Sequence, residues 1–425
     1  MAKVLVVGGG GREHAIVHAL SKSSKVSEIY AAPGNAGIAK LAVCVNIKDT
    51  EVDKLVEFAK AEGIDLVVVG PEASLALGII DEMTNAGIKA FGPTKKATQI
   101  ESSKKFAKEI MMKYNIPTAR YEAFSNYDEA IKFVKIAPFP TVLKYDGLAA
   151  GKGVVIANNF EEAEATLKDM LLDDKFGHGS VVIEQYLEGP EFSFMCLVDN
   201  ENVYPLEMAQ DHKRAYDNDL GPNTGGMGAY SPLPFINQED YDYALNEIMI
   251  PTAKALCKEG VPFKGILYGG LMKTKKGIKV IEFNARFGDP ETEVVLPRLM
   301  SDIYDVFMAI IEGKKPELKW DSFYTLGIVM ASKGYPGDYK KGFIIENAVD
   351  DSIYHMGTKI DDNNNLVTNG GRVLFVVGKG ETLEDANKKA LDLVKNIKCD
   401  NLFYRTDIGA KAYKNRWFYG YCIKW

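Results

Sequence analysis

The chain has 425 residues, 46% of them hydrophobic and 26% charged, which is the composition of a soluble globular protein. This length predicts roughly three domains, because single hydrophobic cores stop growing beyond about 250–300 residues. The formal net charge of −7 and the lack of a long basic run argue against a nucleic-acid binder, and no apolar stretch is long enough to span a membrane.

The cysteines and the N-terminal residues indicate the cellular compartment of the protein. The five cysteines, at positions 44, 196, 257, 399 and 422, are far apart, and no pair has the spacing of a metal or redox site. The opening MAKVLVVGGGG has too short an apolar run for a secretory signal. We therefore expect free thiols and a cytoplasmic protein.

Residues 1 to about 100 alternate between strand and helix patterns. KVLVVG, EIYAAP and IDLVVVGPE are predicted strands, and REHAIVHALSKS and EVDKLVEFAKAEG are predicted helices. Continuous Val and Leu runs separated by helices are typical of a parallel sheet covered on both faces. This region is therefore predicted to be an α/β domain.

Four glycines at 8–11 follow the first strand and open a helix, as in a dinucleotide-binding fingerprint. Glu13 stands where that fingerprint needs its third glycine, and the second strand ends in PGNAG at 33–37 instead of an acidic residue. Nicotinamide binding is therefore disfavoured. A helix N-terminus with bare backbone amides still suits one phosphate. The candidate contacts in the first turn are Gly9, Gly10 and Arg12.

The next region mixes helices and hairpins. ESSKKFAKEIMMKYNIP is predicted to form one helix stopped by proline, and further helices are expected at 160–172 and near 238–259. SFMCLVDNENVYPLE is predicted to turn at Asp199-Asn200, and GILYGGLMKTKKGIKVIEFN at Lys275–Gly277. The final hundred residues have the pattern of a small α+β domain.

A glycine-rich tip at 147–153 joins two β-rich runs between 141 and 158. It is not a P-loop, because the first glycine is one residue too close, Gly153 replaces the required Ser or Thr, and VVIA follows in place of a helix. The segment is either a flap that closes over phosphates or a long mobile hairpin. Lys104 and Lys144 are candidates for nucleotide phosphate contacts, and Lys144 ends an apolar strand beside the flap.

Glu282 and Asn284 are the clearest candidates for a metal site in the sequence. In VIEFN at 280–284 the apolar Ile281 and Phe283 are predicted to share one strand face, so that Glu282 and Asn284 share the other. Carboxylate and amide oxygens suit Mg²⁺, which keeps water and phosphate oxygens as its remaining ligands. The run after the strand is predicted to start a helix with Asp289 as N-cap and Pro290 at N1.

Two further segments carry candidate binding residues. Glu184 to Leu187 end a strand and are expected to lend backbone groups to an adenine edge, with Glu191 on the ribose hydroxyls. A structureless, charged and glycine-rich loop is expected at 211–228, and such loops are usually functional or disordered. His212 is a candidate general base there, although anion binding through Lys213 and Arg214 is the preferred interpretation.

A series of motifs, taken together, resembles the phosphoribosylamine–glycine ligase family of ATP-grasp enzymes. The motifs are GGGGREHA at 8–15, PGNAG at 33–37, VGPE at 69–72, DGLAAGKGV at 146–154, QDHKRAYDNDLGPNTGGMGAYSP at 210–232, EFNARFGDPE at 282–291, ASKGYPGDY at 331–339 and GGRVL at 370–374. The resemblance covers essentially the whole chain in order. The run at 210–232 together with RFGDPE is specific to this family among ATP-grasp enzymes.

The resemblance implies a multidomain fold of α/β and α+β parts. A Rossmann-like N-terminal domain is expected at 1–100, an ATP-grasp domain at 101–325 with a flap at about 120–190, and a C-terminal domain at 326–425. The implied reaction joins glycine to 5-phosphoribosylamine through glycyl phosphate, with ATP as co-substrate and Mg²⁺ or Mn²⁺ as metal, in purine biosynthesis. The implied assembly is a monomer or weak homodimer without nucleic-acid or membrane partners.

The residue patterns and the resemblance together assign the site. The expected ATP contacts are Lys104, Lys144, Gly147, Gly151, Lys152, Gly153, Glu184, Leu187 and Glu191. The expected substrate contacts are Gly9, Gly10, Arg12, Gly34, Asn35, Asp211, Lys213, Arg214, Asn223, Thr224, Gly225 and Arg286. The metal ligands are Glu282 and Asn284, and the catalytic residues are Arg286, Lys152, Asp211 and Lys213.

The chain departs from the family at three motif positions: Glu293 stands where Gln is usual, Tyr145 where Ala is frequent, and Gln185 where a second Glu is common. Two other functions stay open. A related ATP-grasp carboxylase or amino-acid ligase would share the metal pair and differ at 210–232. A non-catalytic nucleotide-binding module is the second, and the complete metal pair argues against it.

Overall fold

The computed structural model describes residues 1–147, 153–173 and 179–413, together with the backbone of 417–418 and 421–422. Gly151 and Lys152, two predicted ATP contacts, lie outside these residues. Within the described ranges, no helix combines the length and the hydropathy needed to cross a membrane. Cys44, Cys196, Cys257 and Cys399 are free thiols.

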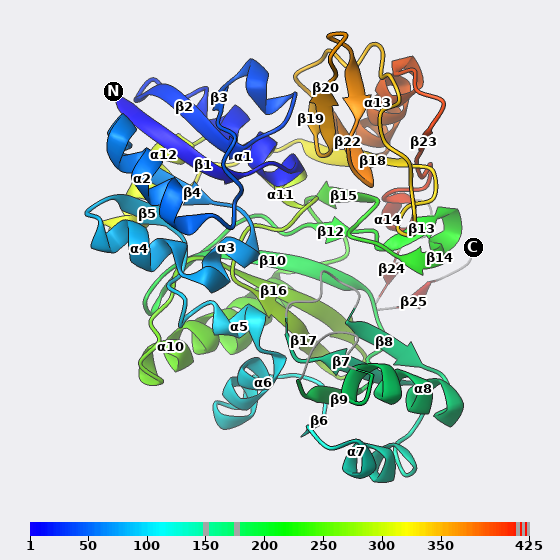
Figure 1. Ribbon diagram of the computed structural model, residues 1–425. Coiled ribbons are helices and arrows are strands. Elements are labelled where there is room, and N and C mark those ends of the chain that lie inside the picture. Colours follow the sequence, from blue (N-terminus) through cyan, green and yellow to red (C-terminus); the bar gives the residue numbers. More distant parts are fainter. Residues whose placement is uncertain (148–152, 174–178, 414–416, 419–420, 423–425) are drawn as a thin grey trace.

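The N-terminal residues form a five-stranded parallel sheet in the order β3-β2-β1-β4-β5. The strands are β1 (Ala2–Gly8), β2 (Val26–Pro33), β3 (Val43–Cys44), β4 (Leu66–Val69) and β5 (Lys89–Phe91), and the helices are α1 (Gly11–Leu20), α2 (Val52–Glu62), α3 (Glu72–Leu77) and α4 (Ile79–Asn85). Val4 and Val6 pack into one core, and Leu5 and Val7 pack into another. The predicted parallel sheet with two covered faces is confirmed (Figure 1).

An antiparallel flap sheet has the strand order β6-β9-β7-β8. Its strands are β6 (Tyr121–Phe124), β7 (Thr141–Tyr145), β8 (Val154–Ala157) and β9 (Val181–Gln185), and its helices are α7 (Tyr127–Val134) and α8 (Phe160–Leu171). Leu143 and Ile183 pack with Ala130 and Leu167 in a small core of their own. The predicted pairing of the strands around the glycine-rich tip is confirmed.

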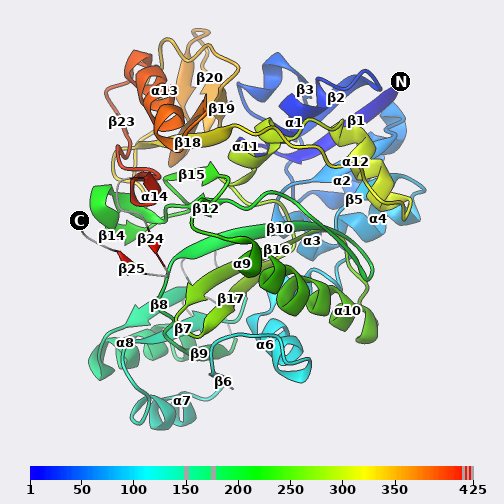
Figure 2. The ribbon, with the colours of Figure 1, turned by 180° about the vertical axis from the view of Figure 1, so that it is seen from behind.

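The central sheet has the strand order β11-β10-β16-β17. Its strands are β10 (Glu191–Asp199), β11 (Asn202–Pro205), β16 (Lys264–Thr274) and β17 (Gly277–Asn284). Both predicted hairpins of this sheet are confirmed, but the first turn lies at Asn200-Glu201, one residue later than predicted, because Asp199 pairs with Asn202. A helical stretch crosses its back (Figure 2) and consists of α9 (Gln238–Tyr243), a π-helical segment Ala244–Met249 and α10 (Ile250–Lys258). Ile248 and Leu256 pack there against Leu267 in the largest core.

The helix predicted at 101–117 is two helices, so that prediction is wrong. α5 (Gln99–Ser102) ends at Ser103, and α6 (Lys104–Lys113) begins after it. Ser103 has extended backbone angles, and its side chain accepts a hydrogen bond from the Phe106 N–H, which makes it the N-cap of α6. The serine therefore restarts the helix at the residue before Lys104.

The C-terminal sheet has the order β12-β15-β18-β22-β19, with β23 paired to β18. Its strands are β12 (Gln210–Asp211), β15 (Gly228–Ser231), β18 (Tyr324–Ser332), β19 (Ile353–His355), β22 (Arg372–Gly380) and β23 (Leu402–Phe403), and α13 (Leu383–Asn396) packs on it. The predicted loop at 211–228 is not structureless. It contributes β12 and β15 to this sheet and also forms the hairpin β13 (Arg214–Tyr216)–β14 (Leu220–Asn223).

The remaining short elements join these parts. α11 (Thr292–Val295) and α12 (Ile303–Ile311) follow the central sheet and return to the N-terminal sheet, where α11 contacts α1 and α12 contacts β5 (Figure 1). The others are the 3-10 helices Ile38–Lys40, Asp217–Asp219 and Leu296–Arg298, the hairpins β20 (Thr358–Ile360)–β21 (Leu366–Thr368) and β24 (Trp417–Phe418)–β25 (Tyr421–Cys422), and α14 (Ala410–Tyr413).

Candidate active site

The predicted metal ligands lie at the end of β17. The register between β16 and β17 shifts so that Gly270 faces Glu282 while Leu271 faces Val280, which leaves Ile281 as an extra residue. Val280 and Phe283 both enter the core, and Ile281 does not. The prediction that Ile281 and Phe283 share a face is therefore wrong, because a bulge shifts the alternation. Glu282 and Asn284 still flank the buried Phe283.

The surroundings of Glu282 fit a divalent cation. Burial alone would raise the pKa of Glu282, but the ammonium groups of Lys213, Lys144 and Lys104 lower it overall, so the carboxylate stays charged. The Asn284 amide oxygen is 3.4 Å from a guanidinium nitrogen of Arg286. In the described part of the chain, no group of three or more His, Cys, Asp or Glu has metal-binding geometry. An ion here would therefore complete its shell with water or phosphate oxygens.

Glu184 is the centre of a buried charge cluster between the flap sheet and α6. Its two carboxyl oxygens lie 3.1 Å from Lys144 Nζ and 3.1 Å from Lys108 Nζ. Lys144 also donates to the Ile281 carbonyl at 2.8 Å, which ties β7 to the strand that carries the metal pair. Burial lowers the pKa of Lys108 to about 8, although Glu184 opposes the shift.

Lys108 was missed by the sequence interpretation. It lies four residues after Lys104 on α6, so both side chains lie on one face of the helix. This four-residue spacing is the feature of the sequence from which Lys108 could have been identified. Lys104 itself donates to the carbonyl of Gly147 at 2.9 Å, at the base of the glycine-rich tip. Burial lowers its pKa, and Glu282 opposes that shift.

The role expected for the Glu184 backbone is wrong. β9 is paired on both sides, with β6 and with β7, and the Glu184 carbonyl also accepts the Thr141 hydroxyl at 3.0 Å. A strand enclosed by two neighbours has its backbone groups committed to them, so only the side chain of Glu184 contributes. Leu187 lies in the connection between β9 and β10, beyond this pairing.

Asp211 and Lys213 line the same small cavity as Glu282 of the central sheet. Lys213 Nζ lies 3.0 Å from the Glu191 carboxylate, whose negative charge raises the lysine pKa. Burial raises the pKa of Asp211 to about 7, and Lys213 only partly offsets the shift. A small cavity is lined by Glu191, Asp211, Lys213, Tyr268 and Glu282. Predicted ATP, substrate and metal residues from three sequence segments therefore converge here.

The other end of this segment lies away from the cavity. Arg214 is exposed on the β13–β14 hairpin, pairs in register with Asn223, and donates to the Gly221 carbonyl at 2.7 Å. Arg405 holds this hairpin, because its buried guanidinium binds Asp219 at 3.0 Å and the Arg214 carbonyl at 3.0 Å. No sequence signal pointed to Arg405.

His212 does not act as a base in this arrangement, so that alternative is wrong. Its Nε2 accepts the backbone N–H of Gly409 at 3.1 Å, and the ring is buried. Burial, followed by the positive charge of Arg405, lowers the pKa of His212 to about 4. The neutral ring therefore ties the loop to the C-terminal segment.

We expect His212→Ala to lower the free energy of unfolding by about 1–3 kcal/mol, because the buried Gly409 N–H loses its acceptor. Turnover of the folded variant should change by no more than a few-fold. His212→Gln is the control, since its amide oxygen can still accept that hydrogen bond. Urea unfolding and steady-state rates check this. A large loss of turnover at unchanged stability would restore a catalytic role.

The two predicted glycine turns of the N-terminal sheet lie together. The Gly34 N–H donates to the Gly8 carbonyl at 3.1 Å, and the Asn35 amide donates to the carbonyls of Gly9 at 3.0 Å and His355 at 2.8 Å. A Cβ at Gly9 would lie 2.5 Å from the Gly34 carbonyl oxygen, so only glycine permits this approach. Asn35 therefore joins the two turns to the C-terminal sheet.

The amides at the start of α1 are not bare, contrary to the prediction. The Gly10 N–H donates to the Glu13 carboxylate at 2.6 Å, and the Arg12 N–H donates to Asp289 at 3.3 Å. Glu13 also pairs with the Arg12 guanidinium at 2.6 Å. Carboxylates from the chain itself therefore occupy positions that a phosphate was expected to fill.

Arg286 links this acidic surface to the metal pair. Its guanidinium lies 3.3 Å from Glu72 and 3.0 Å from Glu101, both in the N-terminal part of the chain. Arg12 and Arg286 both donate to the Phe287 carbonyl, at 3.2 and 3.3 Å. Hydrogen bonds and ion pairs thus connect the glycine turns to the predicted metal ligands Glu282 and Asn284.

Asp289 has a different role from the predicted N-cap. α11 begins only at Thr292, and Asp289 instead pairs with Arg372 at 2.9 Å. Arg372, which sequence reasoning did not assign, also donates to the Gly225 carbonyl at 2.7 Å. Its position in the GGRVL motif was the only feature of the sequence that pointed to Arg372. In the same loop, the Thr224 hydroxyl donates a hydrogen bond to the Lys213 carbonyl at 2.8 Å.

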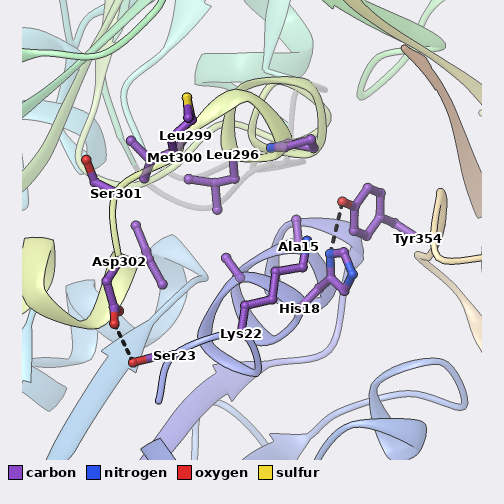
Figure 3. A pocket seen from close by; sticks show the side chains of 13 residues that line it. Ala15, His18, Lys22, Ser23, Leu296, Leu299, Met300, Ser301, Asp302 and Tyr354 are labelled. Carbon is purple, nitrogen blue, oxygen red and sulfur yellow. Dashed lines mark hydrogen bonds between the residues drawn. The ribbon is translucent and has the colours of Figure 1, made fainter. Parts of the chain in front are cut away.

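A cavity of about 230 Å³ lies elsewhere, between α1, the segment 296–303 and Tyr354 (Figure 3). His18 of α1 and Lys22, just beyond the end of that helix, line it opposite Leu296 and Asp302. None of the predicted site residues lines this cavity. We therefore place the candidate active site at the network described above.

Three sequence models of one family match the chain. They are the phosphoribosylglycinamide synthetase N domain over residues 2–101, its ATP-grasp (A) domain over 102–292 and its C domain over 325–411. The matches follow one another along the chain without overlap.

Curated relatives agree with these matches. The chain is 53% identical over 419 residues to phosphoribosylamine–glycine ligase of Halalkalibacterium halodurans, covering 97% of this chain and 98% of the relative. It is 46% identical over 422 residues to the same-named protein of Escherichia coli O6:H1, covering 96% and 98%.

Two solved structures are similar to this fold. The crystal structure of phosphoribosylamine–glycine ligase from Thermotoga maritima superposes with a TM-score of 0.84 at 35% identity, over 96% of this chain and 100% of that one. Biotin carboxylase from Campylobacter jejuni reaches a TM-score of 0.75 at only 15% identity, over 98% and 95%. The second likeness shows a shared fold alone.

Proposed function

Because the chain belongs to the phosphoribosylglycinamide synthetase family, we propose that the network around Glu282 and the two glycine turns carries out the ligase reaction of that family. The protein joins glycine to 5-phosphoribosylamine and converts ATP to ADP and phosphate. The product is glycinamide ribonucleotide, an intermediate of purine biosynthesis. The observation that carries the residue assignment is the convergence of Lys104, Lys144 and Lys213 on Glu282.

The ATP half of the site is assigned to residues of the flap sheet, α6 and the central sheet. Lys104 and Lys144 lie beside the glycine-rich tip and the metal pair, where they neutralise phosphate charge. Glu191 and the backbone near Leu187 are assigned to the nucleoside end. Gly147 and Gly153, which flank the tip, are assigned to the phosphate end of ATP.

Glu282 and Asn284 are assigned as the ligands of a divalent cation, Mg²⁺ or Mn²⁺. When bound, the cation would neutralise charge that develops on the transferred phosphoryl group. The reaction needs no covalent nucleophile from the protein. Transfer of the γ-phosphoryl to the glycine carboxylate gives glycyl phosphate, whose acyl carbon the ribosylamine nitrogen then attacks.

The acceptor half is assigned to the loop that contains Thr224 and Gly225 and to the turns at 8–11 and 33–37, although the amides of Gly10 and Arg12 are already held by carboxylates of the chain. The Phe287 carbonyl and Arg286 connect these turns to the metal pair. As the amide bond forms, the C–O bond to phosphate breaks and the amine loses a proton. Asp211, whose pKa burial raises to about 7, is suited to accept that proton near neutral pH.

Some features are proposed on the family likeness and composition. We divide the chain near residues 100 and 325, although β12 and β15 from the middle part pair within the C-terminal sheet. We further propose a cytoplasmic protein that acts as a monomer or weak homodimer.

The test mixes enzyme, ATP, magnesium and glycine with phosphoribosylamine formed in place from ribose 5-phosphate and ammonia. ADP should accumulate steadily only when glycine and the phosphorylated amine are both present, in equal amounts with the new amide. Alanine should be rejected, because a small carboxylate pocket excludes a larger acid sterically.

Controls omit one substrate at a time or replace phosphoribosylamine by unphosphorylated ribosylamine. Equal ADP formation with that amine, or with alanine, would contradict the substrate assignment. Steady ADP release without glycine would favour a different ATP-grasp activity.

A further inference from the structure

The bulge of β17 lies directly before the carboxylate of the metal pair. Ile281 is its extra residue, because Val280 and Glu282 face neighbouring residues of β16. β17 is also the last strand of the central sheet, so its outer edge has no strand partner in that sheet. Backbone groups buried at such an edge need partners from elsewhere in the chain. The partners of Val280 and Ile281 therefore decide how the bulge is held.

The segment Pro117-Thr118, which follows α6, supplies most of these partners. The Val280 N–H donates to the Pro117 carbonyl at 2.8 Å, and the Thr118 hydroxyl donates to the Val280 carbonyl at 2.9 Å. Thr118 and Val280 thereby form an isolated parallel bridge. The next carbonyl, that of Ile281, accepts a hydrogen bond from Lys144 Nζ at 2.8 Å. Two side chains from outside the sheet thus bind the two successive carbonyls of the bulge.

The Thr118 hydroxyl is itself fixed by the buried charge cluster around Glu184. Lys108 Nζ donates to the Thr118 oxygen at 2.8 Å and lies 3.1 Å from the Glu184 carboxylate. The other oxygen of that carboxylate lies 3.1 Å from Lys144 Nζ. Because an ammonium group can only donate, the single proton of the Thr118 hydroxyl is left for the Val280 carbonyl. The direction of this hydrogen bond is therefore set by Lys108.

The bulge decides where the metal pair points. If the strand after it slipped by one residue to remove the bulge, each of its side chains would move to the opposite face. Glu282 would then turn toward the core, and Phe283 would leave it. The burial of Phe283 opposes that slip from one side of the bulge, and the contacts of Val280 and Ile281 oppose it from the other.

We propose that Thr118 is a positioning residue of the metal site. Its hydroxyl links Lys108 to the Val280 carbonyl and so maintains the bulge that directs Glu282 and Asn284 to the metal. Thr118 acts through the backbone of β17 and not by contact with ATP or the metal. The inference rests on the proposed function, because it takes Glu282 and Asn284 as the metal ligands. Loss of the hydroxyl should therefore weaken only the part of nucleotide binding that depends on the metal.

The test compares Thr118→Val, which keeps the shape of the side chain without its hydroxyl, with Thr118→Ser, which keeps the hydroxyl. The readout is the Kd of β,γ-imido-ATP, which is not hydrolysed, by titration calorimetry with magnesium and again in EDTA. The ratio of the two Kd values is the tightening by the metal. The matched control is Thr252→Val on α10, which removes another hydroxyl that donates to a backbone carbonyl, that of Ile248 at 2.7 Å.

We expect Thr118→Val to reduce the tightening by magnesium about tenfold, because groups that orient metal ligands have effects of this order. The Kd in EDTA should stay within about twofold of wild type, and so should both Kd values of Thr118→Ser and Thr252→Val. Thr118→Ala, which cannot clash with its neighbours, should repeat the result of Thr118→Val. Combined with Glu282→Gln, the effect of Thr118→Val should be smaller than in wild type, because both changes act on the same ligand. A residue that only stabilises the fold would not change one Kd and leave the other.

Three outcomes would overturn the inference. An unchanged magnesium effect in Thr118→Val would mean that the bulge does not need the hydroxyl. A Thr118→Ser variant as defective as Thr118→Val would mean that the methyl group matters instead. Failure of Thr118→Val and Thr118→Ala to fold would make Thr118 a structural residue. A distinct result, in which Glu282→Gln binds the nucleotide with the full magnesium effect, would refute the metal assignment of the proposed function, and this inference with it.

Discussion

Replacing Glu282 by Gln should lower turnover by about 10²–10³-fold, because one group that stabilises charge in the transition state is lost. The carboxylate lies among the ammonium groups of Lys213, Lys144 and Lys104, and these lysines keep it ionised. Asn284→Ala should have an effect of the same order. Steady-state assays at several magnesium concentrations measure the loss. A metal-ligand role also predicts that the variants need more metal for half-maximal rate.

The matched control is Glu161→Gln on α8, an exposed position where the same chemical change should leave the rate unaltered. Unfolding curves for all variants separate loss of metal from loss of fold. Near-normal turnover of Glu282→Gln at ordinary magnesium concentrations would remove Glu282 from the metal site.

Glu184→Gln should lower the free energy of unfolding by about 3–5 kcal/mol, because Lys108 and Lys144 would stay buried without their carboxylate. Both lysine ammonium groups lie 3.1 Å from Glu184, and all three side chains are almost fully buried. Urea unfolding at neutral pH measures this loss. Glu109→Gln, an exposed change on α6 beside Lys108, is the control and should alter stability by less than about 0.5 kcal/mol.

The pH dependence gives an independent check. The pKa of Lys108 is lowered to about 8 in the folded wild type, against about 10.4 in an unfolded chain. Between these values the unfolded state binds more protons, so the contribution of this group to stability increases as pH rises. Without Glu184 the folded pKa should fall further, which extends that window to lower pH. A second change, Lys108→Met, should recover part of the lost stability.

Equal stability of Glu184→Gln and wild type at pH 7 would show that the two lysines do not need the carboxylate. A loss of stability that does not diminish as pH rises would assign the effect to packing and not to the buried charges.

The sequence by itself determined the elements whose signals are local. The parallel N-terminal sheet followed from Val and Leu runs separated by amphipathic helices, and the hairpins followed from polar turns between β-rich runs. The family resemblance rested on long motifs and is confirmed by the matches over residues 2–292 and 325–411. Glu282 and Asn284 were found because residues two apart on a strand share a face whether or not a bulge precedes them.

Only the tertiary structure decided which side chains became partners. Glu184 binds Lys108 and Lys144 because the flap sheet lies against α6, and His212 binds Gly409 because the C-terminal segment packs on the loop. The carboxylate of Asp289 reaches the amide of Arg12 at the start of α1 from nearly three hundred residues away. Such contacts depend on how separate elements pack, and spacing along the chain carries no information about them. The burial of Glu293, and the lack of a hydrogen-bond partner for its carboxyl among the described residues, are visible only in the folded chain for the same reason.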